Sequence, residues 1–192
     1  MALSLFRMKF FLVFMLGVLF STPGSADGPS NVYKVTVTLF EMYNGTSWVT
    51  VSNGTSTTID IAAANSGQAA GNFFAGLNVP DGTYSQVRVT PSATFVVKGN
   101  DGAGRYTTAA NGPNGGCVYS NSAAAEAQCS VSVPGGITAT PDVLSTPVTV
   151  TNGIASHKVR VNFNTSNTIQ YNALANELFP GTPTVTMTLI PQ

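Results

Sequence analysis

Residues able to act as acids, bases or nucleophiles are few and widely spaced in this chain of 192 residues. His157 is the single histidine, and its alternate neighbours Val159, Val161 and Phe163 are apolar. We therefore expect its ring to cover the core at the end of a strand rather than to serve as a base. The sequence has no G-x-S-x-G motif, which would present a nucleophilic serine. These observations predict a protein that is not an enzyme and has no catalytic residues.

The carboxylates indicate neither a metal site nor a glycosidase site. A glycosidase needs two carboxyl groups that face each other across a cleft, and here they lie singly along the chain. The segment 100–104 (NDGAG) holds part of a calcium-loop pattern, but the full D-x-[DN]-x-[DN]-G motif is missing. We expect no metal and no cofactor. The carboxylates concerned are Glu41, Asp60, Asp81, Asp101, Glu126, Asp142 and Glu177.

The aromatic residues supply a clue to binding. Tyr43 and Trp48 flank the turn 44–47, and a loop of this length places them opposite each other on neighbouring strands. On a solvent-facing sheet, such a pair stacks against the apolar face of a sugar ring. The alternative, which we favour from the sequence, is that Trp48 closes one end of the core.

Two cysteines, Cys117 and Cys129, lie close together in a chain that is predicted to be exported. A redox or metal pair needs C-x-x-C spacing or nearby histidines and carboxylates, and neither is present. We expect a structural disulfide, as is usual in oxidising compartments. It closes a loop of about 13 residues, for which the chain-entropy model gives roughly 3 kcal/mol.

The first 26 residues have the pattern of a cleaved signal peptide. Arg7 and Lys9 precede the apolar run 10–20, and the small residues 21–26 lead to a cut before Asp27. A membrane anchor needs about 20 apolar residues, and this run is shorter. We expect a secreted protein, extracellular or periplasmic, whose residues 27–192 form one domain with no membrane span.

Charge is scarce, because only 8% of the residues are charged. Removal of the leader takes away two basic residues and no acidic one, which leaves a formal charge of −2. Nucleic acid binding depends on basic side chains that neutralise phosphates, and this chain lacks an excess of them. Nucleic acid is therefore excluded as an expected partner.

The hydrophobic pattern predicts antiparallel β-strands. Residues alternate between apolar and polar in 33–39, and turn signals such as Asn44-Gly45, Asn53-Gly54 and Asn152-Gly153 recur between short β-rich runs. The predicted fold class is all-β, an antiparallel β-sandwich of the prealbumin or immunoglobulin type. Two segments, 62–70 and 171–179, are expected to form short helical turns.

The stretch 48–90 contains an apolar strand, the segment D-I-A-A-A at 60–64, a short link and then L-N-V-P-D-G-T-Y-S-Q-V-R-V at 77–89. It resembles the central motif of a bacterial secreted or cell-surface domain family of unknown function, in which a strand enters P-x-G-x-Y-x-x-[IV]-R. The segment 150–164 is similar to that family's closing hairpin. The resemblance implies a transthyretin-like or prealbumin-like sandwich and no activity. The matching positions are Pro80, Gly82, Tyr84, Val87 and Arg88.

Tyr84 and Arg88 lie four positions apart on one predicted strand, and Val87 has the opposite parity. Strict alternation places both side chains away from the core or towards a second layer. We therefore take Tyr84 and Arg88 as candidate ligand-binding residues, together with Tyr43 and Trp48. The P-D-G turn before them has an architectural reading, because Asp81 can accept hydrogen bonds from backbone amides.

The last strand, 184–190, raises the question of self-association. Pro183 and Pro191 bound it, and its sequence TVTMTLI carries no charge to discourage pairing with another chain. It is either a central, protected strand or an edge open to a second copy. We expect a non-catalytic secreted or cell-surface protein with a structural or adhesive role that includes self-assembly. The alternative is an accessory module that binds carbohydrate or peptide, and surface glycans or a second copy are the expected partners.

Overall fold

The computed structural model describes residues 27–54, 56–63, 77–133, 137 and 139–192, and most of these lie in β-strands. The predicted signal peptide lies outside the described residues. Among the described residues, the helical structure is limited to the 3-10 turn η1 (Ala123–Ala125). The strands are β1 (Asp27–Gly28), β2 (Ser30–Val35), β3 (Val37–Tyr43), β4 (Trp48–Asn53), β5 (Ile59–Asp60), β6 (Gly82–Pro91), β7 (Thr94–Gly99), β8 (Tyr106–Asn111), β9 (Cys117–Ser120), β10 (Cys129–Ser132), β11 (Asp142–Thr151), β12 (Ile154–Ala155), β13 (His157–Asn164), β14 (Ile169–Asn172), β15 (Glu177–Pro180) and β16 (Thr184–Pro191).

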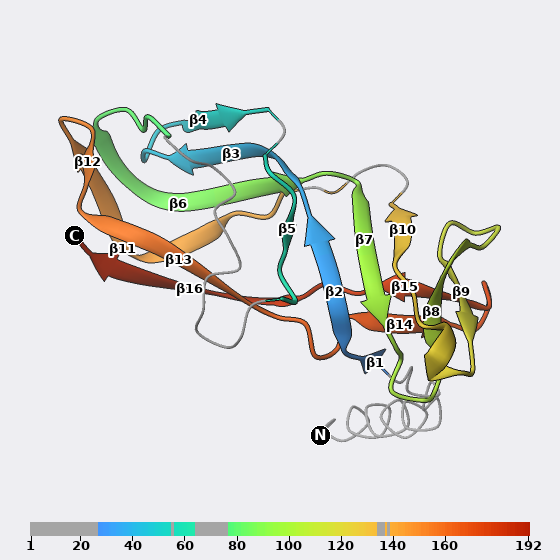
Figure 1. Cartoon of the computed structure of the whole chain (residues 1–192). Helices are drawn as coiled ribbons and strands as arrows, with labels where there is room; N and C mark the ends of the chain where they lie inside the picture. The colour runs from blue at the N-terminus through green and yellow to red at the C-terminus, as the bar shows by residue number, and fades with distance from the viewer. Residues whose placement is uncertain (1–26, 55, 64–76, 134–136, 138) are drawn as a thin grey trace, which may run out of the picture.

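Two of the hydrogen-bonded sheets are the halves of one bent layer. Their strand orders are β10-β7-β2-β5 and β12-β11-β6-β3-β4. Because β2 runs into β3 and β6 runs into β7, neighbouring strands keep the same order on both sides of the bend. The breaks fall at Thr36 and at 92–93, where the Ser92 amide donates to the Thr36 carbonyl at 2.7 Å. Figure 1 shows β3 and β6 across the top of the molecule and β2 and β7 descending from them.

The second layer is built on a long hairpin. β13 pairs with β16 from His157–Pro191 to Asn164–Thr184, and the hairpin continues into the β14–β15 pair. β1 lies beside β14, and β9 and β8 continue the sheet beyond β15. The two layers together form the predicted antiparallel β-sandwich.

The core between the layers has two adjoining regions. The first contains Val97 and Val131 from the bent layer, against Ile169 and Leu178 from the second layer. The second region lies under the other half of the bent layer. It is formed by Met42, Tyr84, Val87, Leu144, Val148 and Val150, against which Val159, Met187 and Leu189 pack. Most side chains in both regions come from the alternating apolar positions that the sequence pattern indicated.

The predicted disulfide is present between Cys117 and Cys129, with a Cα–Cα distance of 5.9 Å. Cys117 lies on β9 of the second layer and Cys129 on β10 of the bent layer, and both residues are buried. The bond therefore ties the two layers together within the first core region.

The helical turn expected at 171–179 is wrong, because this segment is the β14–β15 hairpin. The Asn172 side chain accepts hydrogen bonds from the amides of Leu174 and Ala175, and Asn176 takes a left-handed φ of 57°. These contacts reverse the chain in a tight turn. The other expected turn, 62–70, falls mainly outside the described residues. Within the described part of the chain, no helix has the length and apolar character required to cross a bilayer.

Candidate functional site

The outer face of the bent layer carries an aromatic pair. Tyr43 on β3 and Trp48 on β4 are register partners, as predicted, with ring centroids 5.3 Å apart. The turn between them is stabilised by the Asn44 side chain, which accepts hydrogen bonds from the amides of Thr46 and Ser47. The Tyr43 hydroxyl donates to the Gly45 carbonyl at 3.1 Å. A short, internally bonded turn thus holds the two rings side by side.

Trp48 is not part of either core region, contrary to the position that we favoured from the sequence. Its neighbour Val49 points to the core with Met42, so alternation places Trp48 on the opposite face. The guanidinium carbon of Arg88 lies 4.2 Å from the centroid of the indole. Trp48 and Tyr43 both remain partly exposed. The indole is therefore packed under an arginine at the surface and retains contact with solvent.

Arg88 on β6 is held by a carboxylate that the sequence analysis had not singled out. Its Nε and Nη2 donate to the two carboxyl oxygens of Glu41 at 2.5 and 2.9 Å. Glu41 and Arg88 are register partners on β3 and β6, and the Glu41 side chain is only 9% exposed. The hydrogen bonds that Arg88 donates to Glu41 raise the pKa of Arg88 above its usual value. We call Glu41, Tyr43, Trp48 and Arg88 the aromatic platform.

The structure separates Tyr84 from Arg88, so the prediction that the two side chains share one face of the strand is wrong. Tyr84 is 1% exposed in the second core region, and its hydroxyl donates to the Pro80 carbonyl at 2.8 Å. Tyr84 and Val87 both face the core, although strict alternation would place them on opposite faces. The pairing between β6 and β11 shifts register between Val143 and Val148, next to this part of β6. Such an irregularity interrupts the two-residue alternation.

Asp81 has the architectural role that its turn motif indicated. Its carboxyl oxygens accept hydrogen bonds from the backbone amides of Asn152 and Gly153 at 2.9 and 3.0 Å. The Gly153 and Asn152 amides hold the pKa of Asp81 below its usual value. The contact joins the turn before β6 to the turn between β11 and β12, and so positions the start of the strand that carries Arg88.

The platform has polar groups that are not used within the described structure. Arg88 uses two of its five N–H groups on Glu41, and the others make no hydrogen bond among the described residues. The Trp48 indole N–H and the Gln86 side chain likewise make none there. Gln86 pairs with Tyr43 on one side and with Val143, which is 76% exposed, on the other. An aromatic surface is thus bordered by hydrogen-bond donors and by one exposed apolar residue.

A scan of protein-family models and searches of curated proteins and of solved structures found no match to this chain. The interpretation of the site therefore rests on its geometry. That geometry brings Tyr43, Trp48 and Arg88 together out of the four candidate binding residues and leaves Tyr84 out.

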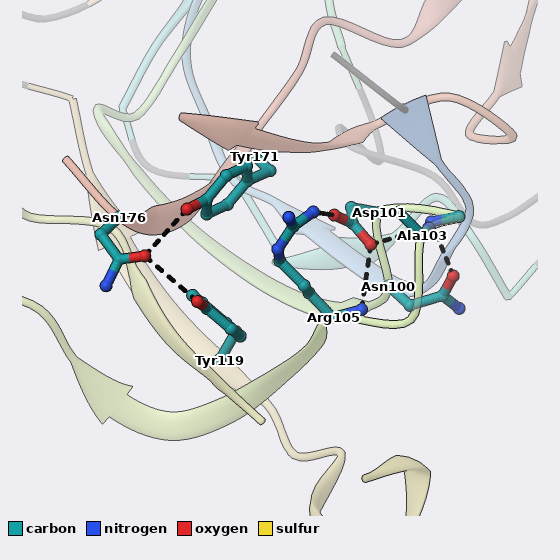
Figure 2. Close-up of polar contacts among 8 residues, drawn as sticks. Asn100, Asp101, Ala103, Arg105, Tyr119, Tyr171 and Asn176 are labelled. Carbon is teal, nitrogen blue, oxygen red and sulfur yellow. Dashed lines mark hydrogen bonds and ion pairs between the residues drawn. The ribbon is translucent and has the colours of Figure 1, made fainter. Parts of the chain in front are cut away.

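A second polar cluster closes the opposite end of the sandwich. Arg105 lies 3.8 Å from the centroid of the Tyr171 ring, and its Nη1 donates to Asp101 at 2.6 Å. The hydroxyls of Tyr119 and Tyr171 both donate to the side-chain Oδ1 of Asn176, at 3.1 and 2.8 Å. Figure 2 shows the two tyrosines converging on Asn176, with Arg105 directed towards Asp101. The side chains of this cluster bind one another, which is typical of a cluster that stabilises the fold.

Asp101, which belongs to the calcium-like sequence fragment 100–104, has a structural role in this cluster. One carboxyl oxygen accepts hydrogen bonds from the amides of Ala103 and Arg105, and the other pairs with the Arg105 side chain. Burial alone would raise the pKa of Asp101, but these hydrogen bonds hold it below its usual value. The carboxylate is thus satisfied by the chain itself. Among the described residues, no three His, Cys, Asp or Glu side chains gather as a metal site.

Glu177 is a second buried carboxylate with a structural role. Its Oε1 accepts hydrogen bonds from the Asn114 amide and side chain, and its Oε2 accepts one from the Gly116 amide at 2.7 Å. A Cβ atom on Gly112 would lie 2.2 Å from the Glu177 carboxyl carbon, so a larger residue there would displace this carboxylate. Burial alone would raise the pKa of Glu177, but these hydrogen bonds lower it. Glu177 therefore organises the loop before β9.

We expect the folded state to lose stability in acid because of Asp101 and Glu177. Both folded-state pKa values lie below the ordinary values of 3.8 and 4.5, so these groups stabilise the fold above those values. That stabilisation is lost as the pH falls through the folded-state pKa values. Urea unfolding measured between pH 7 and about pH 2 should show a falling free energy of unfolding below about pH 4.5.

The double variant Asp101→Asn, Glu177→Gln tests the assignment. It should be less stable than wild type at pH 7 and should show a flatter dependence on pH in the acid range. Asp142→Asn is the matched control, because the Asp142 side chain is exposed and makes no hydrogen bond or ion pair among the described residues. An unchanged acid slope in the double variant would show that other groups govern the acid response.

His157 lies at the start of β13, as expected, and is partly exposed. Its Nδ1 is 2.9 Å from the Ser156 hydroxyl, and its backbone pairs with Pro191. In the described part of the chain no carboxylate bonds to its ring, so the acid–base relay of a hydrolase is not assembled there. The platform, in contrast, offers stacking and hydrogen bonding, which is the chemistry of binding.

Proposed function

We propose that the protein is a non-catalytic, secreted or cell-surface β-sandwich protein with an adhesive role, and that it binds neutral glycans through the aromatic platform. The observation that carries the proposal is the arrangement of Tyr43, Trp48 and Arg88 on one solvent-facing sheet surface. Sugar rings have an apolar face and a polar rim. A surface of aromatic rings bordered by N–H donors complements both.

The charge of the platform favours a neutral glycan over an anionic one. Arg88 is paired with Glu41 through two hydrogen bonds, so the pair has no net charge. A carboxylated or sulfated sugar would bring its negative charge close to Glu41, which makes contact unfavourable. A neutral sugar accepts hydrogen bonds from the unused N–H groups of Arg88 without disturbing the ion pair.

Export of the chain is supported by two independent features. The leader pattern before Asp27 is typical of secreted proteins. The disulfide between Cys117 and Cys129 belongs to an oxidising compartment. In an extracellular or periplasmic location, the protein would have access to glycans of a cell surface or of the surrounding medium.

An array of neutral and acidic glycans, probed with residues 27–192, tests the proposed function. We expect binding to one or more neutral glycans that weakens little with added salt, because the platform has no net charge. Binding that is confined to acidic glycans and lost in salt would contradict the platform as the site.

A second candidate role, structural self-assembly, is favoured by the position of β16. Among the described strands β16 pairs only with β13, so its other edge has no partner there. It carries no charged side chain, whereas Lys158 and Arg160 lie on β13. Val161 and Val185 lie on the core-facing side of this ribbon, yet they are 40% and 43% exposed. These features are those of an edge able to pair with a second copy.

The variant Thr186→Lys tests this second role. Thr186 is exposed and faces away from the core, so the lysine should leave the monomer folded and place a charge on the edge. If wild type associates at high concentration, the variant should shift towards monomer in sedimentation velocity. Thr149→Lys, an exposed position on the paired strand β11, is the matched control and should behave as wild type does. A wild type that stays monomeric at every concentration contradicts self-assembly.

A further inference from the structure

The outer face of the bent layer is hollowed where the layer bends. The hollow has a volume of about 370 Å³ and is lined by residues from β2, β3 and β7 and from the segments beside them. Five of its seven lining residues carry a hydroxyl group, and Val96 adds an apolar side chain. The lining residues are Lys34, Thr36, Thr38, Thr58, Ser92, Thr94 and Val96.

The hollow and the aromatic platform lie on the same face of the same strands. Along the β2–β7 part of the layer, Tyr33 and Val97 point to the core, so Lys34 and Val96 point outwards. Further along, Met42 and Val87 point to the core, so the platform also faces outwards. The register shift in the β3–β6 pairing between residues 37 and 39 keeps the outer face continuous across the bend.

The distance between the two features exceeds one sugar ring. Arg88 of the platform and Ser92 of the hollow are four residues apart on the chain that leads from β6 to β7. Extended strand rises about 3.3 Å per residue, which gives a separation of about 13 Å. Thr90 lies between them, and its carbonyl accepts a hydrogen bond from the Thr38 hydroxyl at 3.1 Å. The strip that joins platform and hollow is therefore polar.

The hydroxyls of the hollow retain hydrogen-bonding capacity. Thr36 and Thr58 share one bond at 2.7 Å, and Thr94 shares one with Ser132 at 3.2 Å. Each threonine hydroxyl offers one donor and two acceptor positions, so a single bond leaves others for a ligand. Lys34 Nζ donates to Gln128 at 3.0 Å and has two more N–H groups. The wall of the hollow can thus exchange hydrogen bonds with sugar hydroxyls in both directions.

We infer that platform and hollow together form one extended binding surface for a neutral β-1,4-linked oligosaccharide, with one sugar ring on Trp48 and later rings in the hollow. This inference rests on the proposed function. A β-1,4-linked chain is extended and can follow the line of β6 from Arg88 to Ser92, whereas an α-1,4-linked chain coils. The proposed class of ligand therefore narrows from neutral glycans in general to extended oligosaccharides that are long enough to reach from the platform to the hollow.

Calorimetric titration of wild type with cellobiose and with cellohexaose tests the inference. We expect cellohexaose to bind at least about tenfold more tightly than cellobiose, because only the longer chain reaches the hollow. The double variant Thr36→Val, Thr94→Val keeps β-branched side chains in the strands and removes two hydroxyls. It should bind cellobiose as wild type does and should lose most of the advantage of cellohexaose.

The outcomes separate the two proposals. Thr83→Val, on β6 away from both features, is the matched control and should leave both affinities unchanged. If cellobiose and cellohexaose bind equally well, or if the double variant keeps the full difference, the extended surface is wrong while the platform stands. If wild type binds neither sugar nor any neutral glycan on the array, the proposed function fails and the inference fails with it.

Discussion

Replacement of Trp48 by alanine is expected to remove glycan binding and to leave the fold intact. Trp48 supplies most of the apolar surface of the platform, and it also supports Arg88 from below at 4.2 Å. Removal of a central aromatic contact costs about 2 kcal/mol or more in binding, which is roughly a thirtyfold loss of affinity. Calorimetric titration with the glycan identified on the array measures this loss directly.

The stability of the Trp48→Ala variant must be measured beside its affinity, together with a control variant. Trp48 is partly exposed and lies outside both core regions, so Trp48→Ala should unfold at a urea concentration close to that of wild type. Tyr119→Ala removes an aromatic ring from the cluster at the other end of the sandwich. It should keep wild-type affinity for the glycan. Equal losses in Trp48→Ala and Tyr119→Ala would place the binding surface elsewhere.

Replacement of Tyr84 by alanine is expected to have the largest effect on stability. Tyr84 is 1% exposed and packs in the second core region, and its hydroxyl is bonded to the Pro80 carbonyl. Truncation of a buried aromatic residue to alanine costs about 3–5 kcal/mol, a large part of the stability of a typical domain. The free energy of unfolding from urea denaturation, monitored by circular dichroism, measures this cost.

Tyr84→Phe separates packing from the hydrogen bond. It keeps the ring and removes the hydroxyl, so we expect a loss of about 1 kcal/mol. If Tyr84→Ala costs no more than Tyr84→Phe, the tyrosine is not buried in the core, and the placement of Arg88 on the opposite face of β6 would also be in doubt.

The strands and the disulfide were predictable from the sequence because their signals are local. Alternation of apolar and polar residues predicted strands at 83–90, 94–98, 156–164 and 184–190, which match β6, β7, β13 and β16 nearly to their ends. The four-residue loop between Tyr43 and Trp48 fixed their cross-strand contact. The disulfide followed from the proximity of Cys117 and Cys129 in the sequence and from the predicted export of the chain.

The faces of the strands were less predictable, because one register shift changes which side chains are buried. Strict alternation placed Tyr84 beside Arg88, and the irregular pairing of β6 with β11 separated them. The segment 171–179 has a composition compatible with a helix, yet Asn172 and Asn176 reverse the chain through side-chain hydrogen bonds and a left-handed φ. Neither effect leaves a periodic signal in the sequence.

The partners within the site depend on pairing between distant strands. Glu41 lies 47 residues from Arg88, and the sequence contains nothing that links the two. The same holds for Thr36 and Ser92, which meet only because β2 and β7 are neighbours in the bent layer. The strands β8 and β10 were predicted only in part, at 105–108 and 131–133, and β9 was read as irregular chain, since their pairing is likewise set by tertiary contacts.

The central claim is that the aromatic platform binds a neutral glycan, and the fluorescence of Trp48 reports on it directly. Trp48 is the single tryptophan of the chain, so its emission arises from the platform alone. Residues 27–192 are titrated with cellobiose, laminaribiose and maltose, and then with the longer oligosaccharides of each series. We predict a saturable change in tryptophan emission with at least one neutral series and protection of the indole from acrylamide quenching. Emission and quenching that stay constant through every titration would contradict the account.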